Sequence, residues 1–221
     1  MRIKGTLSDN TYQRWYLERL GERSVKALRN HDFDAHFFPS AKDAVDFIIK
    51  SVSAYQSFGF GGSVTTRTLG LVEKLGAIGK TVFDHWKEDL SGEEDLELRL
   101  EQGRCDCFMC SANAISATGE IINIDGAGNR TNAMTFGTRK VIIVAGMNKV
   151  VSDLDSALKR AMEVAAPIRA KSLGMETPCA ETGRCSNCSS PMRICRITTI
   201  LHRRPIMTDI TVVLINETLG Y

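Results

Sequence analysis

Two apolar runs constrain the fold of this chain more than any other feature of its sequence. Lys140–Gly146 reads KVIIVAG and Ile210–Ile215 reads ITVVLI, and both are almost wholly apolar. A strand with one solvent-exposed face would instead carry a polar residue at every second position. The two runs therefore predict strands that are covered on both faces, as in a parallel sheet flanked by helices.

Strand-like runs alternate with amphipathic runs along the rest of the chain. Strands are expected at residues 33–38, 55–60 and 81–86, and helices at residues 8–30, 40–52, 69–75 and 152–165, with another beginning near residue 88. Strands and helices that alternate at this spacing form βαβ units. We therefore expect an α/β protein with a mainly parallel central sheet and flanking helices. Residues 1–221 would form one domain, with a cysteine-rich insertion at residues 179–195.

Composition excludes several classes of protein. The chain has 221 residues, of which 43% are hydrophobic, and a net charge of +2, so it can build one sizeable core and offers no electrostatic case for nucleic acid. It has no apolar run suited to a membrane span, and its first residues lack the apolar core of a signal peptide. Its seven cysteines, an odd number confined to two clusters, do not fit an extracellular disulfide framework. We expect a cytoplasmic protein whose cysteines are metal ligands or reduced thiols.

The stretch Ser111–Arg130, SANAISATGEIINIDGAGNR, combines a short strand with tight turns. Glu120–Ile124 mixes β-branched and polar residues, and the Asp-Gly and Gly-Asn pairs that follow supply turns. Polar side chains crowd the stretch, namely Asn113, Ser116, Thr118, Glu120, Asn123, Asp125, Asn129 and Arg130. One interpretation is a solvated hairpin. The one that we favour is the wall of a ligand site, with Arg130 available for an anion.

A glycine-rich loop, FGFGGSVTT at residues 58–66, follows an expected strand and opens an expected helix. Its candidate ligand-binding residues are Gly59, Gly61, Gly62, Ser63, Thr65 and Thr66. Glycines let the backbone approach a ligand, and the hydroxyls stand beside free N–H groups at a helix start. The loop is neither a P-loop nor a complete dinucleotide fingerprint. A plain strand-to-helix turn would use the same residues, but a phosphate or a carboxylate-bearing metabolite would also suit the loop.

The cysteine-rich segment carries four cysteines at irregular spacing, Cys179-x5-Cys185-x2-Cys188-x6-Cys195. Four thiolates in so short a segment can hold one metal centre. Structural zinc sites commonly show two Cys-x2-Cys pairs, and only one pair has that spacing here. The basic residues that follow favour an iron–sulfur cluster, taken as [4Fe–4S], because its thiolate ligands attract cations. Zinc is the alternative, and a set of redox-active thiols is the third interpretation.

The other three cysteines, Cys105, Cys107 and Cys110, suggest burial instead. Cys105 and Cys107 are expected to share one face of a strand, and small core residues are the favoured interpretation for all three. A contribution to the metal centre, or a reactive Cys110, stays open. The four histidines are scattered, so a Ser-His-Asp arrangement is unsupported.

The glycine-rich loop, Ser111–Arg130 and Val141–Lys149 together resemble the lactate-utilisation (LUD-domain) family, and the cysteine-rich segment resembles a subset of that family. The resemblance implies a fold like that of ribose-5-phosphate isomerase, glucosamine-6-phosphate deaminase and CoA transferase, with sites in loops at the strand ends. Family relatives include a component of the iron–sulfur system that oxidises L-lactate to pyruvate. Larger relatives carry a ferredoxin-like module, and no such paired motif occurs in this sequence.

The resemblance implies a lactate-utilisation-type protein in electron transfer or in redox metabolism of a small 2-hydroxy or 2-oxo acid. The glycine-rich loop with Arg130 and Lys149 would bind the carboxylate. Further candidate ligand-binding residues are Asn113, Thr118, Asn129 and Asn148. Glu120 and Asp125 would be the acid–base groups, because carboxylates on a strand that forms the wall of a ligand site can have raised pKa values. Turn capping, or an ion pair with Arg130 or Lys149, would explain both carboxylates without catalysis.

Two other functions remain open. One is an isomerase- or transferase-like enzyme on a phosphate- or acyl-bearing metabolite, with a structural metal and with Glu120 as base or nucleophile. The other is a non-catalytic subunit whose cysteine-rich segment docks a redox partner. The partners expected are a small anionic metabolite, an iron–sulfur or flavin protein, and further copies of this chain in a homo-oligomer.

Overall fold

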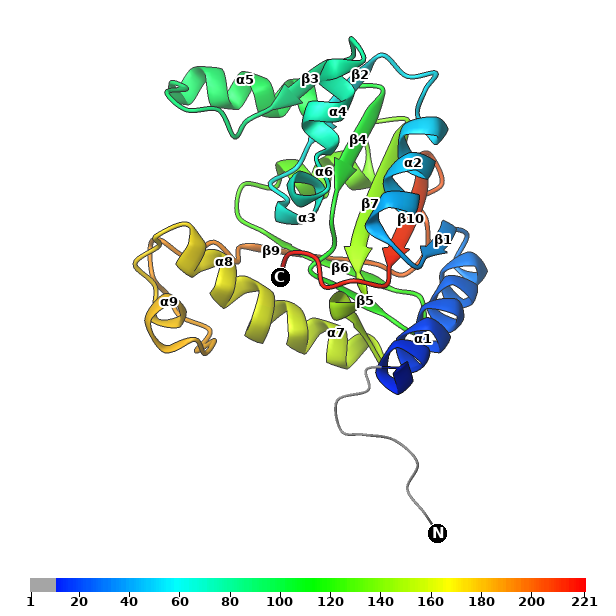
Figure 1. Cartoon of the computed structure of the whole chain (residues 1–221). Helices are drawn as coiled ribbons and strands as arrows, with labels where there is room; N and C mark the ends of the chain where they lie inside the picture. Colours follow the sequence, from blue (N-terminus) through cyan, green and yellow to red (C-terminus); the bar gives the residue numbers. More distant parts are fainter. Residues whose placement is uncertain (1–10) are drawn as a thin grey trace.

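The computed structural model describes residues 11–221 and is organised around a six-stranded sheet (Figure 1). The strands are β1 (Asp34–Phe38), β2 (Ser57–Phe60), β3 (Thr81–Asp84), β4 (Cys107–Cys110), β7 (Lys140–Gly146) and β10 (Asp209–Ile215). They lie in the order β1-β10-β7-β4-β2-β3, and every neighbouring pair is parallel. The α/β class with a mainly parallel sheet is therefore confirmed.

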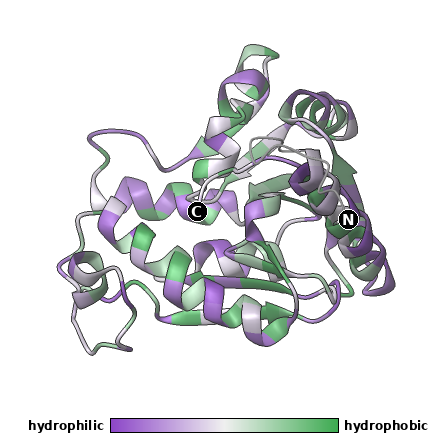
Figure 2. Ribbon diagram, turned by 60° about the horizontal axis from the view of Figure 1, so that its bottom comes forward, coloured by the Kyte–Doolittle hydropathy of each residue, from purple (hydrophilic) through white to green (hydrophobic). Residues whose placement is uncertain are grey.

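Helices cover both faces of this sheet. They are α1 (Thr11–Asn30), α2 (Ala41–Ser51), α3 (Val64–Thr68), α4 (Leu71–Ala77), α5 (Gly92–Gln102) and α6 (Asn129–Thr135). Ile48 of α2 and Leu75 of α4 join the core on one face, and Leu28 of α1 and Met134 of α6 join the core on the other. In α2 the buried residues Ala44, Val45 and Ile48 have the spacing of an amphipathic helix. The helical ribbons carry both hydrophobic and hydrophilic residues (Figure 2). Residues 8–10 of the expected first helix lie outside the described residues.

A smaller sheet of four strands lies beneath the ends of the large one (Figure 1). Its strands are β8 (Val150–Val151), β5 (Ala114–Ser116), β6 (Ile121–Asp125) and β9 (Ile197–Leu201), in that order. Strand β6 is the short strand expected at residues 120–124, and it pairs with β5 as an antiparallel hairpin. Its outer face packs on a long helical segment made of α7 (Leu154–Arg160), a π-helical turn (Ala161–Ala165) and α8 (Ala166–Ser172).

The two apolar runs occupy the middle of the large sheet, as expected. Strand β7 lies between β10 and β4, and each of its residues is buried. Strand β4 is buried along its whole length. Cys107 belongs to the core on one face, whereas Cys110 and Cys105 belong to the core on the other. The expectation that Cys105 and Cys107 share a face is therefore wrong, because the strand begins only at Cys107.

The three cysteines around β4 are core residues. Cys107 and Cys110 are fully buried, and Cys105 is 4% exposed. Burial raises the pKa of the Cys105 and Cys110 thiols to about 12 and that of Cys107 well above its usual range. Because the thiolate is the reactive form, these side chains are inert in the folded protein.

Within residues 11–221, none of the helices combines the length and the apolar character needed to cross a lipid bilayer.

Candidate functional site

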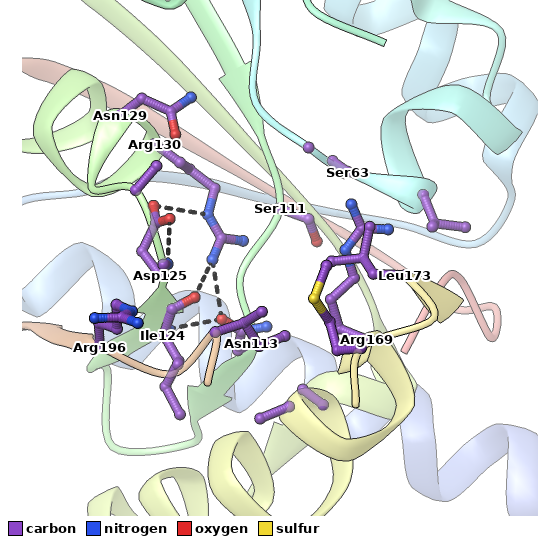
Figure 3. Close-up of a pocket in the computed structure, with 18 of the residues that line it drawn as sticks. Ser63, Ser111, Asn113, Ile124, Asp125, Asn129, Arg130, Arg169, Leu173 and Arg196 are labelled. Atoms are coloured by element: carbon purple, nitrogen blue, oxygen red, sulfur yellow. Dashed lines mark hydrogen bonds and ion pairs between the residues drawn. The ribbon is translucent and has the colours of Figure 1, made fainter. Parts of the chain in front are cut away.

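A pocket of about 730 Å³ opens at the carboxyl ends of β2, β3, β4 and β7. Its walls come from the loops that follow these strands, from the end of β6 and the start of α6, from α8, and from residues 191–196 (Figure 3). The backbone N–H of Arg196 donates to the carbonyl of Asp125 (3.0 Å), which ties the cysteine-rich segment to this wall. Loops at the carboxyl ends of parallel strands are where α/β folds hold ligands.

The lining of the pocket is strongly cationic. Its basic side chains are Arg99, Arg130, Lys149, Arg169, Arg193 and Arg196, and its one carboxylate side chain among the described residues is Asp125. Arg99 pairs with Asp95 and Arg130 with Asp125. The other four cations have no carboxylate within ion-pair distance in residues 11–221. Such a wall attracts a small anion.

Arg130 is fixed in the wall by acceptors from β6 and from the loop between β4 and β5 (Figure 3). Its Nη2 donates to the carbonyl of Ile124 and to Oδ1 of Asn113 (3.2 Å), and its Nε lies 3.7 Å from Oδ2 of Asp125. The Asp125 carboxylate also accepts from the backbone N–H groups of Gly126 and Thr131. Within the described chain, Nη1 of Arg130 has no hydrogen-bond acceptor, so two strong donors are left for a ligand.

Lys149 is buried at the floor of the same pocket. It ends a short 3₁₀ turn after β7 and is 3% exposed. Its Nζ donates to Oγ1 of Thr65 (3.0 Å) and to Oγ of Ser111 (2.9 Å). Burial, and then the guanidinium groups of Arg160 and Arg130, lower the pKa of Lys149 to about 7. A lysine with this environment in a pocket is characteristic of a functional site.

A chain of amides sets the tautomer of His85, which lines the pocket beside β3. Nε2 of Gln102 donates to the carbonyl of Phe83 (3.2 Å) and lies 2.8 Å from Nδ1 of His85, while Nδ2 of Asn129 donates to Oε1 of Gln102 (3.4 Å). The Gln102 amide can satisfy the Phe83 and Asn129 contacts only in this orientation, so Nδ1 of His85 is the acceptor. Burial, and then Arg99, lower the pKa of His85. The ring is therefore neutral and carries its proton on Nε2.

Trp86 joins two walls of the pocket. Its ring lies between the guanidinium groups of Arg67, at 4.0 Å from the ring centroid, and Arg169 of α8, at 4.8 Å. Arg67 is in turn bound to the carboxylate of Asp84 at the end of β3. Cation–π contacts of this kind are worth about 0.5–1 kcal/mol at exposed sites. They hold α8 against the loop that follows β3.

Seven of the residues singled out in the sequence line this one pocket, namely Gly62, Ser63, Asn113, Asp125, Asn129, Arg130 and Lys149. Seven others do not line it, namely Gly59, Gly61, Thr65, Thr66, Thr118, Glu120 and Asn148. Thr65 binds the pocket lysine from behind, and Asn148 anchors the backbone of Leu219 and Gly220. The hydroxyl of Ser63 accepts from the N–H of Thr66 as a helix cap.

Glu120 lies away from the pocket. It precedes β6 and Asp125 ends that strand, so five residues at about 3.3 Å each separate the two by roughly 16 Å. Its carboxylate accepts from the hydroxyls of Ser116 and Thr118. Burial raises the pKa of Glu120, but these two hydrogen bonds, a backbone hydrogen bond and the nearby His31 together leave the pKa lowered. The raised pKa expected from the sequence is therefore wrong for Glu120.

The four cysteines of residues 179–195 are partly exposed free thiols. Arg193 binds the carbonyls of Cys188 (2.7 Å) and Cys195 (2.8 Å) and so shapes the segment. In the part of the chain that the structure describes, no three histidine, cysteine, aspartate or glutamate side chains gather as metal ligands do. The four thiols are donors that suit a metal ion or an iron–sulfur cluster, and the described structure does not gather them into one group.

Sequence reasoning missed several lining residues. His85 and Trp86 are the last two residues of the strand expected at residues 81–86, and they directly follow β3 as the structure has it. The rule that ligands bind at the carboxyl ends of strands could therefore have found them. Arg169 and Tyr221 carry no comparable local signal. Their hydrogen bond across the pocket wall (3.4 Å) depends on how α8 packs.

Comparisons with known proteins agree with this fold. A DUF162 family protein from Deinococcus radiodurans superimposes with a TM-score of 0.51 and 15% identity, over 91% of this chain and 98% of that one. About half of the chain also matches ribose 5-phosphate isomerase from Plasmodium falciparum, with a TM-score of 0.30 and 16% identity over 51% of this chain and 54% of that one. Ribose 5-phosphate isomerase A from Neisseria gonorrhoeae matches with a TM-score of 0.30 and 20% identity, over 52% of this chain and 52% of that one. None of the curated proteins matches. The LUD domain model matches residues 21–215, and the chain therefore belongs to the lactate-utilisation (LUD-domain) family.

Proposed function

We propose that this protein binds a small 2-hydroxy or 2-oxo acid in the pocket at the carboxyl ends of β2, β3, β4 and β7. The observation that carries the proposal is the charge of the lining, in which five guanidinium groups and the amine of Lys149 face one side-chain carboxylate among the described residues. A concave site with this imbalance selects a small anion over neutral or cationic ligands. Membership of the lactate-utilisation family agrees with an acid of this class.

The hydrogen-bond donors of the pocket suit both polar groups of such an acid, namely its carboxylate and the oxygen on the neighbouring carbon. Nη1 of Arg130 and the guanidinium of Arg169 can bind the carboxylate, and Arg–carboxylate contacts are among the strong hydrogen bonds in proteins. The oxygen on the neighbouring carbon would accept from the neutral donor Nε2 of His85. A volume of about 730 Å³ leaves room beyond a three-carbon acid, so a longer chain also fits.

The isomerase- or transferase-like alternative finds less support. It depends on Glu120 as base or nucleophile, and that carboxylate is held by two hydroxyls outside the pocket with a lowered pKa. Asp125, which does line the pocket, is committed to Arg130 and to two backbone N–H groups. Both carboxylates thus have the structural partners that explain them without catalysis.

The redox part of the function stays a prediction. An iron–sulfur centre on Cys179, Cys185, Cys188 and Cys195, and an iron–sulfur or flavin partner protein, are supported by the cysteine spacing and by the family resemblance. The described residues do not gather these thiols into one group.

Binding of L-lactate and pyruvate, measured by calorimetry, tests the proposed function. Arg169→Gln removes one cation of the pocket, and Arg203→Gln removes an exposed arginine that pairs with Asp32 elsewhere. A hydrogen bond to a charged group is worth about 1.5–3 kcal/mol, so Arg169→Gln is expected to weaken binding about 10-fold or more. Arg203→Gln should bind like the wild type. If neither acid binds, or if the two variants lose affinity equally, the proposed function is wrong.

Ribose 5-phosphate and acetyl-CoA serve as the comparison ligands. Binding of either one, without binding of the two acids, would favour the isomerase- or transferase-like alternative.

A further inference from the structure

Lys149 is buried in the pocket without a counter-ion. No carboxylate in residues 11–221 lies within ion-pair distance of its Nζ, and its two hydrogen-bond partners are the neutral hydroxyls of Thr65 and Ser111. Lys140, at the other end of β7, is also buried, but its Nζ lies 2.7 Å from the carboxylate of Asp209. Burial of a cation is costly unless it is paired, so the lack of a partner at Lys149 needs an explanation.

We propose that Lys149 is a nucleophile that forms a reversible imine with the carbonyl group of a 2-oxo acid held in the pocket. The imine depends on the proposed function, because the cationic wall must first bind the carboxylate of the acid.

The geometry suits a neutral amine. An unprotonated amine has two N–H bonds and one lone pair. If the N–H bonds donate to Oγ1 of Thr65 (3.0 Å) and Oγ of Ser111 (2.9 Å), the lone pair is left for a ligand. Lys149 and Ser111 both line the pocket, so a bound acid can reach this amine.

The charges around Lys149 favour its neutral form. Burial acts first, and Arg160 and Arg130 add repulsion, so that the pKa falls to about 7. Arg160 is held nearby by the carbonyls of Asn113 and Asn148. The other titratable group that faces the amine is the thiol of Cys110, which is neutral because burial raises its pKa to about 12. A lysine desolvated beside other cations is an activated nucleophile.

The step balances without any oxidant or reductant. The amine of Lys149 attacks the carbonyl carbon, a C–N bond forms, and the C–O bond breaks. The carbonyl oxygen leaves as water with both amine protons, which yields the imine. Arg130 lies beside Lys149 in the pocket lining and would hold the carboxylate of the acid during this step.

Reduction of the imine provides the test. The protein is incubated with pyruvate near pH 7, treated with sodium borohydride, and analysed by intact mass and peptide mapping. We expect one adduct with the mass of pyruvic acid less one oxygen atom, located on Lys149. Lys149→Arg, whose guanidinium forms no stable imine, should lose the adduct, and Lys140→Arg should keep it.

L-Lactate separates the imine from the proposed function, because it has the carboxylate but no carbonyl group. If calorimetry shows that both acids bind but Lys149 stays unmodified, or that modification is spread over surface lysines, the imine is wrong and the anion site stands. If neither acid binds, both are wrong. Mapping on the wild-type protein decides the question even if Lys149→Arg does not fold.

Discussion

The side chain of Lys149 loses water on folding and gains two hydroxyl partners, Thr65 and Ser111, but no carboxylate among the described residues. Its pKa accordingly falls from 10.5 to about 7, first through burial and then through Arg160 and Arg130. Between these two pH values the unfolded chain binds a proton at this position and the folded chain does not. Stability therefore rises with pH wherever this difference exists.

Lys149→Met is predicted to abolish this pH dependence. The free energy of unfolding of the wild type, relative to that of Lys149→Met, should rise between pH 7 and pH 10.5, by up to about 1.4 kcal/mol per pH unit. Below pH 7 both states of the wild type are protonated, so the difference should level off. Urea unfolding of both proteins across this range measures it, and a difference that stays flat throughout would contradict the prediction.

At the scale of elements, the packing of β2 against the end of α5 requires a glycine. A Cβ atom on Gly59 would lie 2.8 Å from the backbone Cα and O of Gln102. Gly59→Ala is therefore expected to lower the free energy of unfolding by about 1–3 kcal/mol, because backbone cannot move aside cheaply. Gly76→Ala in α4, where a Cβ would meet nothing within 4 Å, should instead stabilise by roughly 0.5–1 kcal/mol. Equal effects of the two substitutions in urea unfolding would refute this account of Gly59.

Metal and sulfide analysis tests the prediction that the cysteine-rich segment holds an iron–sulfur cluster. Protein purified without oxygen is predicted to contain iron and acid-labile sulfide, and the variant with Cys185→Ser and Cys188→Ser to contain neither. Because the described structure leaves the four thiols apart, cluster binding should also protect residues 183–196 from proteolysis. Colourless protein with bound zinc would contradict the redox prediction and leave a structural metal site.

At the scale of the whole molecule, the reactivity of the seven thiols distinguishes cysteines in the core from cysteines near the surface. In metal-free protein we predict that four thiols, those of residues 179–195, react quickly with a thiol reagent. Cys105, Cys107 and Cys110 are buried around β4 and their pKa values are raised by burial, so they should react only when the molecule unfolds. Quick labelling of all seven thiols in native conditions would show that β4 does not lie in a closed core.

The fold class could be predicted because single strands and helices have recognisable patterns of apolar residues. Lys140–Gly146 was predicted with both ends correct, because burial on both faces leaves an unbroken apolar run. The strand expected around Cys105 and Cys107 begins only at Cys107, and strand β9 was not identified. Cys107–Cys110 is a short run whose place between β2 and β7 comes from pairing with distant strands, and Ile197–Leu201 pairs with β6 across the cysteine-rich segment. Pairing of this kind leaves no periodic signal in a short segment.

The sequence by itself determined the α/β class and the polar groups at the ends of the strands, among them Ser63, Asn113, Arg130 and Lys149. Only the tertiary structure decided which of these groups share a pocket. Glu120 and Asp125 are near neighbours in sequence, yet an extended strand carries them to opposite ends of β6. Trp86 and Arg169 lie far apart in sequence, yet the packing of α8 brings them into contact. Side-chain type is a property of one position, whereas proximity depends on how remote elements pack.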